Sequence, residues 1–185
     1  MATNPVLVIG VGEAGVRMLK NFSDVIEKEN VDKSDFKLFA IDTAEDVDNN
    51  FPSLSNDRKL ILKNPMGWDE MVNKYEYLKP GDEPGSQGGV TRNRPVARGL
   101  VDDSENFSVL YNRLESEVSD LVVGDEAADI WILNSLGGGT GSGMQPILSA
   151  MLYDVVRELD TAGARSAKIL IHGIGTIPKL DDIQG

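Results

Sequence analysis

Five of the eight residues from Leu136 to Gly143 are glycines, and this loop constrains the fold more than any other stretch of the chain. The apolar run before it, ADIWILNS at 128–135, is typical of a buried strand, and residues 144–160 carry apolar residues at helical spacing. The glycines are therefore expected at a turn from a strand into a helix. At such a turn backbone N–H groups meet the positive end of a helix dipole, and glycine lets an anion approach without meeting a Cβ. The pattern predicts an anion-binding loop.

Thr140 and Ser142 lie among these glycines and can add hydroxyl donors for a phosphate. A bulkier residue at Gly138 or Gly139 is expected to block the path of the phosphate while leaving the fold largely intact. The alternative is a structural turn that binds nothing, in which the glycines serve only the backbone.

Strand-like and helix-like segments alternate along the chain, and this order predicts an α/β fold. Short apolar runs typical of strands occupy residues 5–10, 36–42, 58–63, 128–135 and 167–176. Helical segments are expected at 16–30, at 95–123 with a break around 102–106, and at 144–160. Such alternation requires a parallel sheet covered by helices on both faces, in which ligands bind beyond the carboxyl ends of the strands. We expect the glycine-rich loops to meet at this edge.

The composition excludes several classes of function. A net charge of −12 argues against general binding of nucleic acid, because neutralising phosphates needs clustered Lys and Arg. The acidic residues indicate either a solvated surface or adaptation to high salt. The absence of cysteine excludes disulfides and thiolate chemistry, and the one histidine, His172, lies in an apolar run where a structural role is expected. No apolar run is long enough to span a membrane and no secretory signal is found, so we expect no transmembrane segment and a cytoplasmic protein.

The first glycine loop leaves two nucleotide classes open. Residues 10–15, GVGEAG, match G-x-G-x-x-G between a strand and a helix, and Asp42 ends the second strand, where it could bind an adenosine ribose. This pair of features is typical of a nicotinamide-dependent oxidoreductase. The second glycine loop favours a phosphate chain held from two sides, since a dinucleotide fold needs only one such turn. No Gly-Lys-Ser or Gly-Lys-Thr occurs, so neither loop is of the Walker type.

The second loop, SLGGGTGSGM at residues 135–144, resembles the signature loop of the tubulin and FtsZ superfamily and is close to its tubulin form. Supporting matches are GVGEAG, AIDTAED at 40–46, and IPKLDD at 177–182, which resembles the ribose-side loop of tubulins. Residues 145–147 (QPI) and 94–98 (RPVAR) look more like FtsZ. The mixture resembles a divergent prokaryotic tubulin-like protein of archaeal type. It implies a Rossmann-like GTPase domain built on a parallel sheet flanked by helices.

The resemblance implies a guanine-nucleotide site, with GTP or GDP and Mg²⁺ as cofactors. The residues that would bind them come from five loops: Gly12, Glu13, Ala14 and Gly15; Asp42 and Thr43; Gly88, Gly89, Val90 and Thr91; Gly137, Gly138, Gly139, Thr140, Gly141 and Ser142; and Asp182. The signature loop would cradle the α- and β-phosphates, with the loop at 81–94 near the γ-phosphate.

Charged residues near these five loops need a separate interpretation. Glu13 stands where the family usually has glutamine or glycine, and a carboxylate repels polyphosphate unless a cation lies between them. Glu13 is therefore expected to be either a Mg²⁺ ligand or a sign of altered binding. Arg92 or Arg94 could approach the terminal phosphate, or both could offset nearby acids.

The resemblance covers nearly the whole chain but only the first half of a superfamily GTPase domain. The guanine-reading segment and the acidic loop that completes hydrolysis on the next subunit are expected later. Residues 1–185 are thus expected to be a nucleotide-binding domain truncated after the ribose-side loop. The resemblance implies a cytoskeletal protein whose partner is itself, as filament subunits, and which hydrolyses GTP only on assembly, so this chain alone is expected to be inactive. A nucleotide-binding regulator that does not polymerise is a further alternative.

Overall fold

A computed structural model of the chain describes residues 4–44, 47–63, 67–81, 90, 92–121, 127–161 and 168–178. Five strands form one parallel sheet in the order β3-β2-β1-β4-β5. The strands are β1 (Val6–Val11), β2 (Phe36–Asp42), β3 (Lys59–Ile61), β4 (Ala128–Ser135) and β5 (Ile169–Thr176). The helices are α1 (Gly12–Lys28), α2 (Val47–Asn50), α3 (Trp68–Lys74), α4 (Arg94–Asp102), α5 (Ser104–Leu121) and α6 (Thr140–Thr161), with short 3₁₀ turns at Lys33–Asp35 and Asn56–Arg58. The predicted α/β class with a parallel sheet is confirmed.

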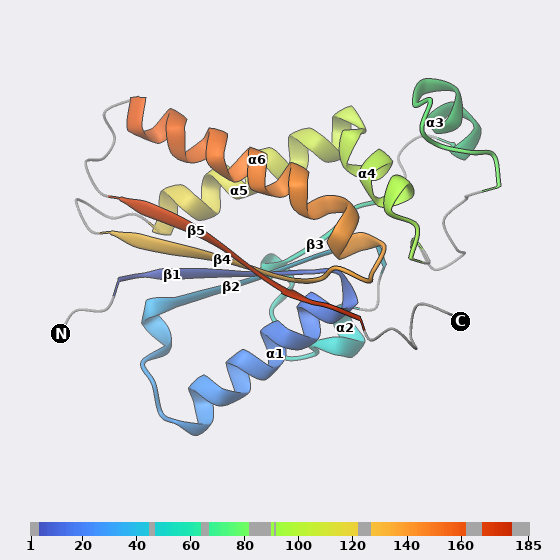
Figure 1. Cartoon of the computed structure of the whole chain (residues 1–185). Helices are drawn as coiled ribbons and strands as arrows, with labels where there is room; N and C mark the ends of the chain where they lie inside the picture. Colours follow the sequence, from blue (N-terminus) through green and yellow to red (C-terminus); the bar gives the residue numbers. More distant parts are fainter. Residues whose placement is uncertain are drawn as a thin grey trace.

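Helices cover both faces of the sheet, as the alternation of elements predicts. α1 and α2 lie on one face, and α4, α5 and α6 lie on the other (Figure 1). Successive side chains of β1 serve the two faces in turn: Leu7 and Ile9 join the core under α4 to α6, while Val8 packs with Val16 and Leu19 of α1. The central strand is therefore buried on both sides. Within the described residues, no helix is long and apolar enough to cross a membrane.

Several element boundaries agree with the sequence. β2 and β4 occupy the residues predicted for them. The predicted break between two helices falls at Asp103, whose carboxylate accepts hydrogen bonds from the backbone N–H groups of Glu105 and Asn106 at 3.0 and 3.1 Å. Asp103 thus satisfies free donors in the first turn of α5, which is why a new helix starts there.

Other boundaries differ from the prediction. β3 is shorter than the predicted strand at 58–63, and neither α2 nor the helix at Trp68–Lys74 was predicted. Two helices begin four residues earlier than predicted: α1 begins at Gly12 and not at residue 16, and α6 begins at Thr140 and not at residue 144. Glycine and hydroxyl residues have low helix propensity, but the first turn of α6 is stabilised by packing against its neighbours. Thr140, Gly141 and Ser142 therefore belong to a helix start and not to a free loop.

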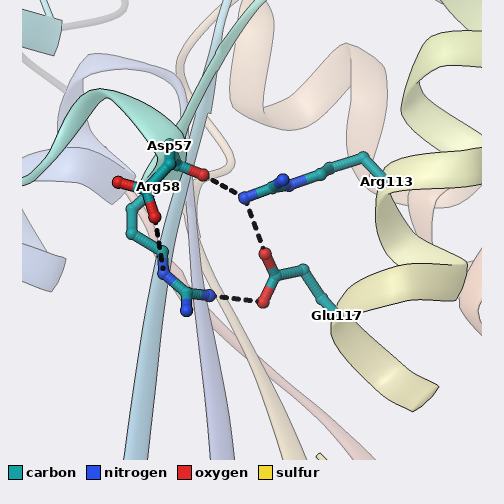
Figure 2. A network of polar contacts seen from close by, with 4 residues as sticks. All are labelled: Asp57, Arg58, Arg113 and Glu117. Carbon is teal, nitrogen blue, oxygen red and sulfur yellow. Dashed lines mark hydrogen bonds and ion pairs between the residues drawn. The ribbon is translucent and has the colours of Figure 1, made fainter. Parts of the chain in front are cut away.

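A buried carboxylate ties the edge strand β3 to α5 (Figure 2). The side chain of Glu117 is 4% exposed and receives Nη1 of Arg58 at 2.6 Å and Nη2 of Arg113 at 2.8 Å. Arg113 also donates to the backbone carbonyl of Asp57, and its guanidinium lies 5.2 Å from the centre of the Phe39 ring. This cluster holds the segment that leads into β3 against the side of the sheet covered by α5.

We expect Glu117→Ala to lower the free energy of unfolding by about 2–4 kcal/mol, because two arginines then lose the buried carboxylate between them. Urea unfolding at pH 7 measures this value. Glu115→Ala, at an exposed position of the same helix, is the control and should change the free energy by less than about 0.5 kcal/mol. Equal effects of the two substitutions would contradict a role for the cluster in holding β3.

Candidate functional site

Three helices begin side by side at the carboxyl edge of the sheet. A Cβ placed on Gly12, the first residue of α1, would lie 3.0 Å from the backbone nitrogen of Gly141 in the first turn of α6. A Cβ on Gly139 would lie 2.8 Å from the backbone nitrogen of Asn93, which caps α4. The first N–H groups of a helix have no partner within it and carry a partial positive charge. The three helix starts together make a favourable place for an anion.

Close packing explains most of the glycines at this edge. Gly12 has a φ of 70°, a conformation that side-chain-bearing residues rarely adopt. At four other positions an added Cβ would lie within 3.0 Å of a backbone carbonyl oxygen: Gly10, Gly15, Gly141 and Gly143. Backbone therefore packs directly on backbone where α1 meets β1 and β4, and where α6 meets β1 and α4. The structural reading, kept as an alternative above, accounts for these glycines.

Gly138 and Gly139 differ from each other, which corrects one prediction. A Cβ on Gly139 would lie 2.7 Å from Cγ2 of Val90 and 2.9 Å from the carbonyl carbon of Arg92, so a larger residue there would disturb the packing on α4. The expectation that Gly139 could be replaced with the fold intact is therefore wrong. Among the described residues, a Cβ on Gly138 would have only Ser135 within 4 Å, with its nearest atom at 3.6 Å. Within this part of the chain, Gly138 therefore has more room beside its backbone than Gly139 has.

The two hydroxyls of the loop form hydrogen bonds inside the protein. Ser142 donates to the carbonyl of Gly138, one turn earlier. Oγ1 of Thr140 lies 3.0 Å from Oγ1 of Thr43, which follows β2. The Thr140–Thr43 contact joins the glycine-rich loop to the residues that follow β2, so segments far apart in the sequence meet at this edge of the sheet. The two contacts also use the hydroxyls that the sequence offered as phosphate donors.

Asp42 is buried beneath the loops and does not face solvent. Only 3% of it is exposed, and its carboxylate accepts a hydrogen bond from the backbone N–H of Thr43 at 2.7 Å. Burial raises the pKa of Asp42 to about 6, although hydrogen bonds from the backbone of Thr43 and Ala44 and from the Thr140 hydroxyl lower it, and the nearby charge of Glu13 adds to the rise. An enclosed carboxyl of this kind is badly placed for the ribose contact that a dinucleotide site needs.

Glu13 lies at the start of α1 and has a cationic partner. Its Oε1 lies 2.6 Å from Nη2 of Arg17, and the two side chains are 59% and 63% exposed. Nε of Arg17 also donates to the side chain of Asn50 at 3.0 Å. Arg17 thus offsets the carboxylate that the sequence placed beside polyphosphate. No group of three or more Asp, Glu or His side chains suited to a metal ion occurs in the part of the chain that the structure describes, and Glu13 as a Mg²⁺ ligand stays a prediction.

The described part of the predicted γ-phosphate loop at 81–94 contacts the glycine-rich loop. Val90 is buried against Gly139, and Arg92 has a φ of 62°. Nη2 of Arg94, the first residue of α4, donates to the carbonyl of Leu136 at 2.6 Å and so brings a positive charge to the rim of the signature loop. The predicted site residues Gly88, Gly89, Thr91 and Asp182 lie outside the described residues.

Asn134, at the end of β4, is a residue of this site that the sequence did not indicate. It is fully buried, and its Nδ2 donates to the carbonyl of Gly141 at 3.2 Å and to Oε1 of Gln145 at 2.6 Å. Asn134 therefore holds the first turn of α6 onto the sheet. The only available signal was one amide among apolar residues at the end of a strand, which is too weak to assign a role.

His172 agrees with the structural role expected of it. Its ring stacks on Trp131 with a centroid distance of 4.2 Å, and Nε2 lies 2.8 Å from Oδ1 of Asp129. These contacts tie the middle of β5 to β4.

No protein-family model and no curated protein matches the chain, but solved structures do. CetZ from Methanosaeta thermophila matches with a TM-score of 0.59 at 21% identity, over 95% of this chain and 37% of the other. CetZ1 from Haloferax volcanii, a GDP-bound monomer, gives a TM-score of 0.57 at 16% identity, over 96% and 43% of the two chains. CetZ2 from the same organism, a GTPγS-bound protofilament, gives 0.48 at 20% identity, over 91% and 39%.

The CetZ proteins are archaeal members of the tubulin/FtsZ family, so the chain has a tubulin-like fold. The resemblance stated from the signature loop is confirmed at the level of the fold. The chain spans less than half the length of these structures.

The raised pKa of Asp42 predicts how stability depends on pH. Because the folded-state pKa of about 6 exceeds the ordinary value of 3.8, Asp42 favours folding when it is protonated, and this contribution is lost as pH rises through 6. Two pKa units correspond to about 3 kcal/mol. Asp42→Asn lacks this titrating group, so its stability does not carry the same loss. We therefore expect the difference in free energy of unfolding, Asp42→Asn minus the natural chain, to increase by up to about 3 kcal/mol from pH 4 to pH 8.

Urea unfolding at several pH values measures this difference. The control is Asp120→Asn at an exposed position of α5, for which the difference should stay nearly constant. A constant difference for Asp42→Asn as well would contradict a buried carboxyl that ionises near pH 6.

Proposed function

We propose that the chain is the nucleotide-binding domain of a tubulin/FtsZ-like cytoskeletal protein and that it binds GTP and GDP. The observation that carries this proposal is the meeting of three helix starts at the glycine-rich loop, where Gly12 approaches Gly141 and Gly139 approaches Asn93. A diphosphate or triphosphate is the ligand that matches several converging sets of backbone N–H groups.

In this proposal the phosphates lie along the backbone from Gly137 to Gly139 and against the start of α1 at Gly12 to Gly15. Backbone donors carry the binding, because the hydroxyls of Thr140 and Ser142 already have partners within the protein. Arg94 adds a positive charge at the rim. Mg²⁺ would accompany the nucleotide, and it would reduce the repulsion between the phosphates and Glu13.

The shared fold supports guanine as the base. CetZ1 from Haloferax volcanii is GDP-bound and has a fold like that of this chain. The tubulin-like signature loop quoted from the sequence points the same way. Assembly with copies of itself into filaments, in the cytoplasm, belongs to the same proposal.

A nicotinamide-dependent oxidoreductase is the second candidate, since the glycine loop at 10–15 fits a dinucleotide site as well as a guanine-nucleotide site. The burial of Asp42 counts against it, because the carboxylate that would bind the ribose is enclosed and bound by Thr43 and Ala44. Calorimetric titrations with GTP, GDP and NAD separate the two candidates. Binding of NAD that is tighter than binding of GDP would overturn the proposal.

We expect Gly138→Ala to weaken GDP binding by about tenfold or more while it leaves the unfolding temperature unchanged, because the added Cβ occupies the room beside the loop and lies no closer than 3.6 Å to any described atom. Isothermal titration calorimetry and thermal unfolding measure the two quantities. Gly81→Ala is the matched control, because a Cβ there meets no described atom within 4 Å and Gly81 lies outside the helix starts. Unchanged GDP affinity in Gly138→Ala would contradict the cradle.

We also propose that GTP hydrolysis depends on assembly of subunits. A chain that does not assemble can then bind GTP without hydrolysing it. We expect phosphate release per subunit to stay near zero for this chain at every protein concentration, and to rise with concentration in a protein that assembles. Rapid release that does not depend on concentration would show that the chain contains its own catalytic group.

A further inference from the structure

Asn134 is a fully buried amide at the end of β4, beneath the first turn of α6. Its Nδ2 donates to the carbonyl of Gly141 at 3.2 Å and to Oε1 of Gln145 at 2.6 Å. Its Oδ1 is also buried, and no residue in the described part of the chain donates a hydrogen bond to it. A buried acceptor without a partner costs stability, and an apolar side chain at this position would avoid that cost. The two donated hydrogen bonds are therefore what this amide contributes.

The surrounding backbone holds the Asn134 amide in one orientation. Asn134 is paired with Gly175 of β5, where an added Cβ would lie 3.2 Å from Oδ1. On the other side, an added Cβ on Gly141 would lie 3.2 Å from Cβ of Asn134. Exchanging the places of Oδ1 and Nδ2 would set Oδ1 against the carbonyl oxygen of Gly141, which cannot donate. Nδ2 therefore faces α6, and both of its hydrogens have acceptors there.

The first turn of α6 presents the free donors of this helix. The first helical hydrogen bond runs from the N–H of Gly143 to the carbonyl of Gly139 at 2.9 Å. The N–H groups of residues 140–142 precede it, so they have no acceptor within the helix. Pro146 has no N–H, which leaves the carbonyl of Ser142 without its usual helical donor. A first turn with fewer helical bonds needs support from outside the helix, and the buried amide beneath it supplies that support.

One of the two hydrogen bonds of Asn134 acts on a free donor. The carbonyl of Gly141 and the N–H of Ser142 belong to the same planar peptide group. A hydrogen bond donated to the carbonyl fixes the plane of that group and polarises it, which makes its N–H a stronger donor. Asn134 can therefore act on an N–H at the helix start although its own side chain is buried.

We propose that Asn134 is a positioning residue of the nucleotide site, which fixes the peptide group between Gly141 and Ser142 so that the Ser142 N–H donates to phosphate. This inference rests on the proposed nucleotide binding and adds to it a buried residue that strengthens one backbone donor. Asn134 acts through the peptide group and does not contact the nucleotide. An amide suits this task because it donates without bringing a charge, whereas a carboxylate would only accept and would repel the phosphate.

Calorimetric titration with GDP in the presence of Mg²⁺ compares the natural chain with three variants. Asn134→Leu loses both donated hydrogen bonds, and Asn134→Asp loses them when its carboxyl is ionised. Gln145→Met is the control, because it removes the other acceptor and leaves the bond to Gly141 in place. At pH 8 we expect GDP to bind both Asn134 variants about three- to tenfold more weakly than the natural chain. We expect Gln145→Met to bind GDP within about twofold of the natural chain.

The Asn134→Asp variant gives a readout that a purely structural role would not move. A protonated carboxyl can donate to the carbonyl of Gly141, and burial makes its protonation easier. Lowering the pH from 8 to 5 should therefore bring GDP binding by Asn134→Asp towards that of the natural chain, while Asn134→Leu keeps its deficit. Comparison at equal pH removes the titration of the nucleotide and of Asp42, which all these proteins share. Equal affinities of the two Asn134 variants at pH 5 would show an effect of charge alone and would overturn the role of the hydrogen bond.

Amide spectra of the ¹⁵N-labelled natural chain test the same peptide group without any substitution. Addition of GDP should shift the amide of Ser142 more than the amides in the middle of α6. An unchanged Ser142 amide would overturn the inference, and so would equal GDP affinity of the natural chain and both Asn134 variants at every pH. In either case the proposed nucleotide binding would stand. If the natural chain does not bind GDP, the proposed function fails and this inference fails with it.

Discussion

The structure depends on direct contact between backbone segments where α1 and α6 begin. β1 and β4 are neighbours; β1 leads directly into α1, and β4 leads into α6 through the glycine-rich turn at 136–139. The two helix starts can lie this close only because no side chain stands between them: Gly12 faces Gly141, and Gly15 packs under the carbonyl of Leu133. The same contact that fixes the angle of the helices brings their free N–H groups together.

This arrangement explains how a chain with a net charge of −12 can offer a place for an anion. The attraction comes from backbone N–H groups and helix dipoles at short range, not from a basic surface. Of the local carboxylates, Glu13 is paired with Arg17, and burial raises the pKa of Asp42 to about 6. Surface acids elsewhere act through solvent and salt, which screen them over about 10 Å.

The sequence predicts the sheet and the edge where the site lies, but not the role of each residue. Apolar runs bounded by polar residues give β2 and β4 correctly, since buried strands are encoded locally. The start of α6 at Thr140, the hydrogen bond between Thr140 and Thr43 and the contact of Gly139 with α4 depend on segments distant in sequence. A glycine in the sequence can serve close packing or ligand access, and the sequence does not tell which. The structure shows that Gly139 is closely packed against α4, whereas Gly138 has more room beside its backbone.

The most direct test of the account is the change in backbone amide chemical shifts when GDP is added to ¹⁵N-labelled protein. If the phosphates bind where the helices begin, the largest changes will fall on the amides of residues 12–15 and 137–140, while the amino ends of the strands stay unchanged. The two sets of amides should titrate together with one dissociation constant. Changes confined to residues 10–15 and the end of β2, with none at 137–140, would contradict the account and indicate a site built on the first loop alone.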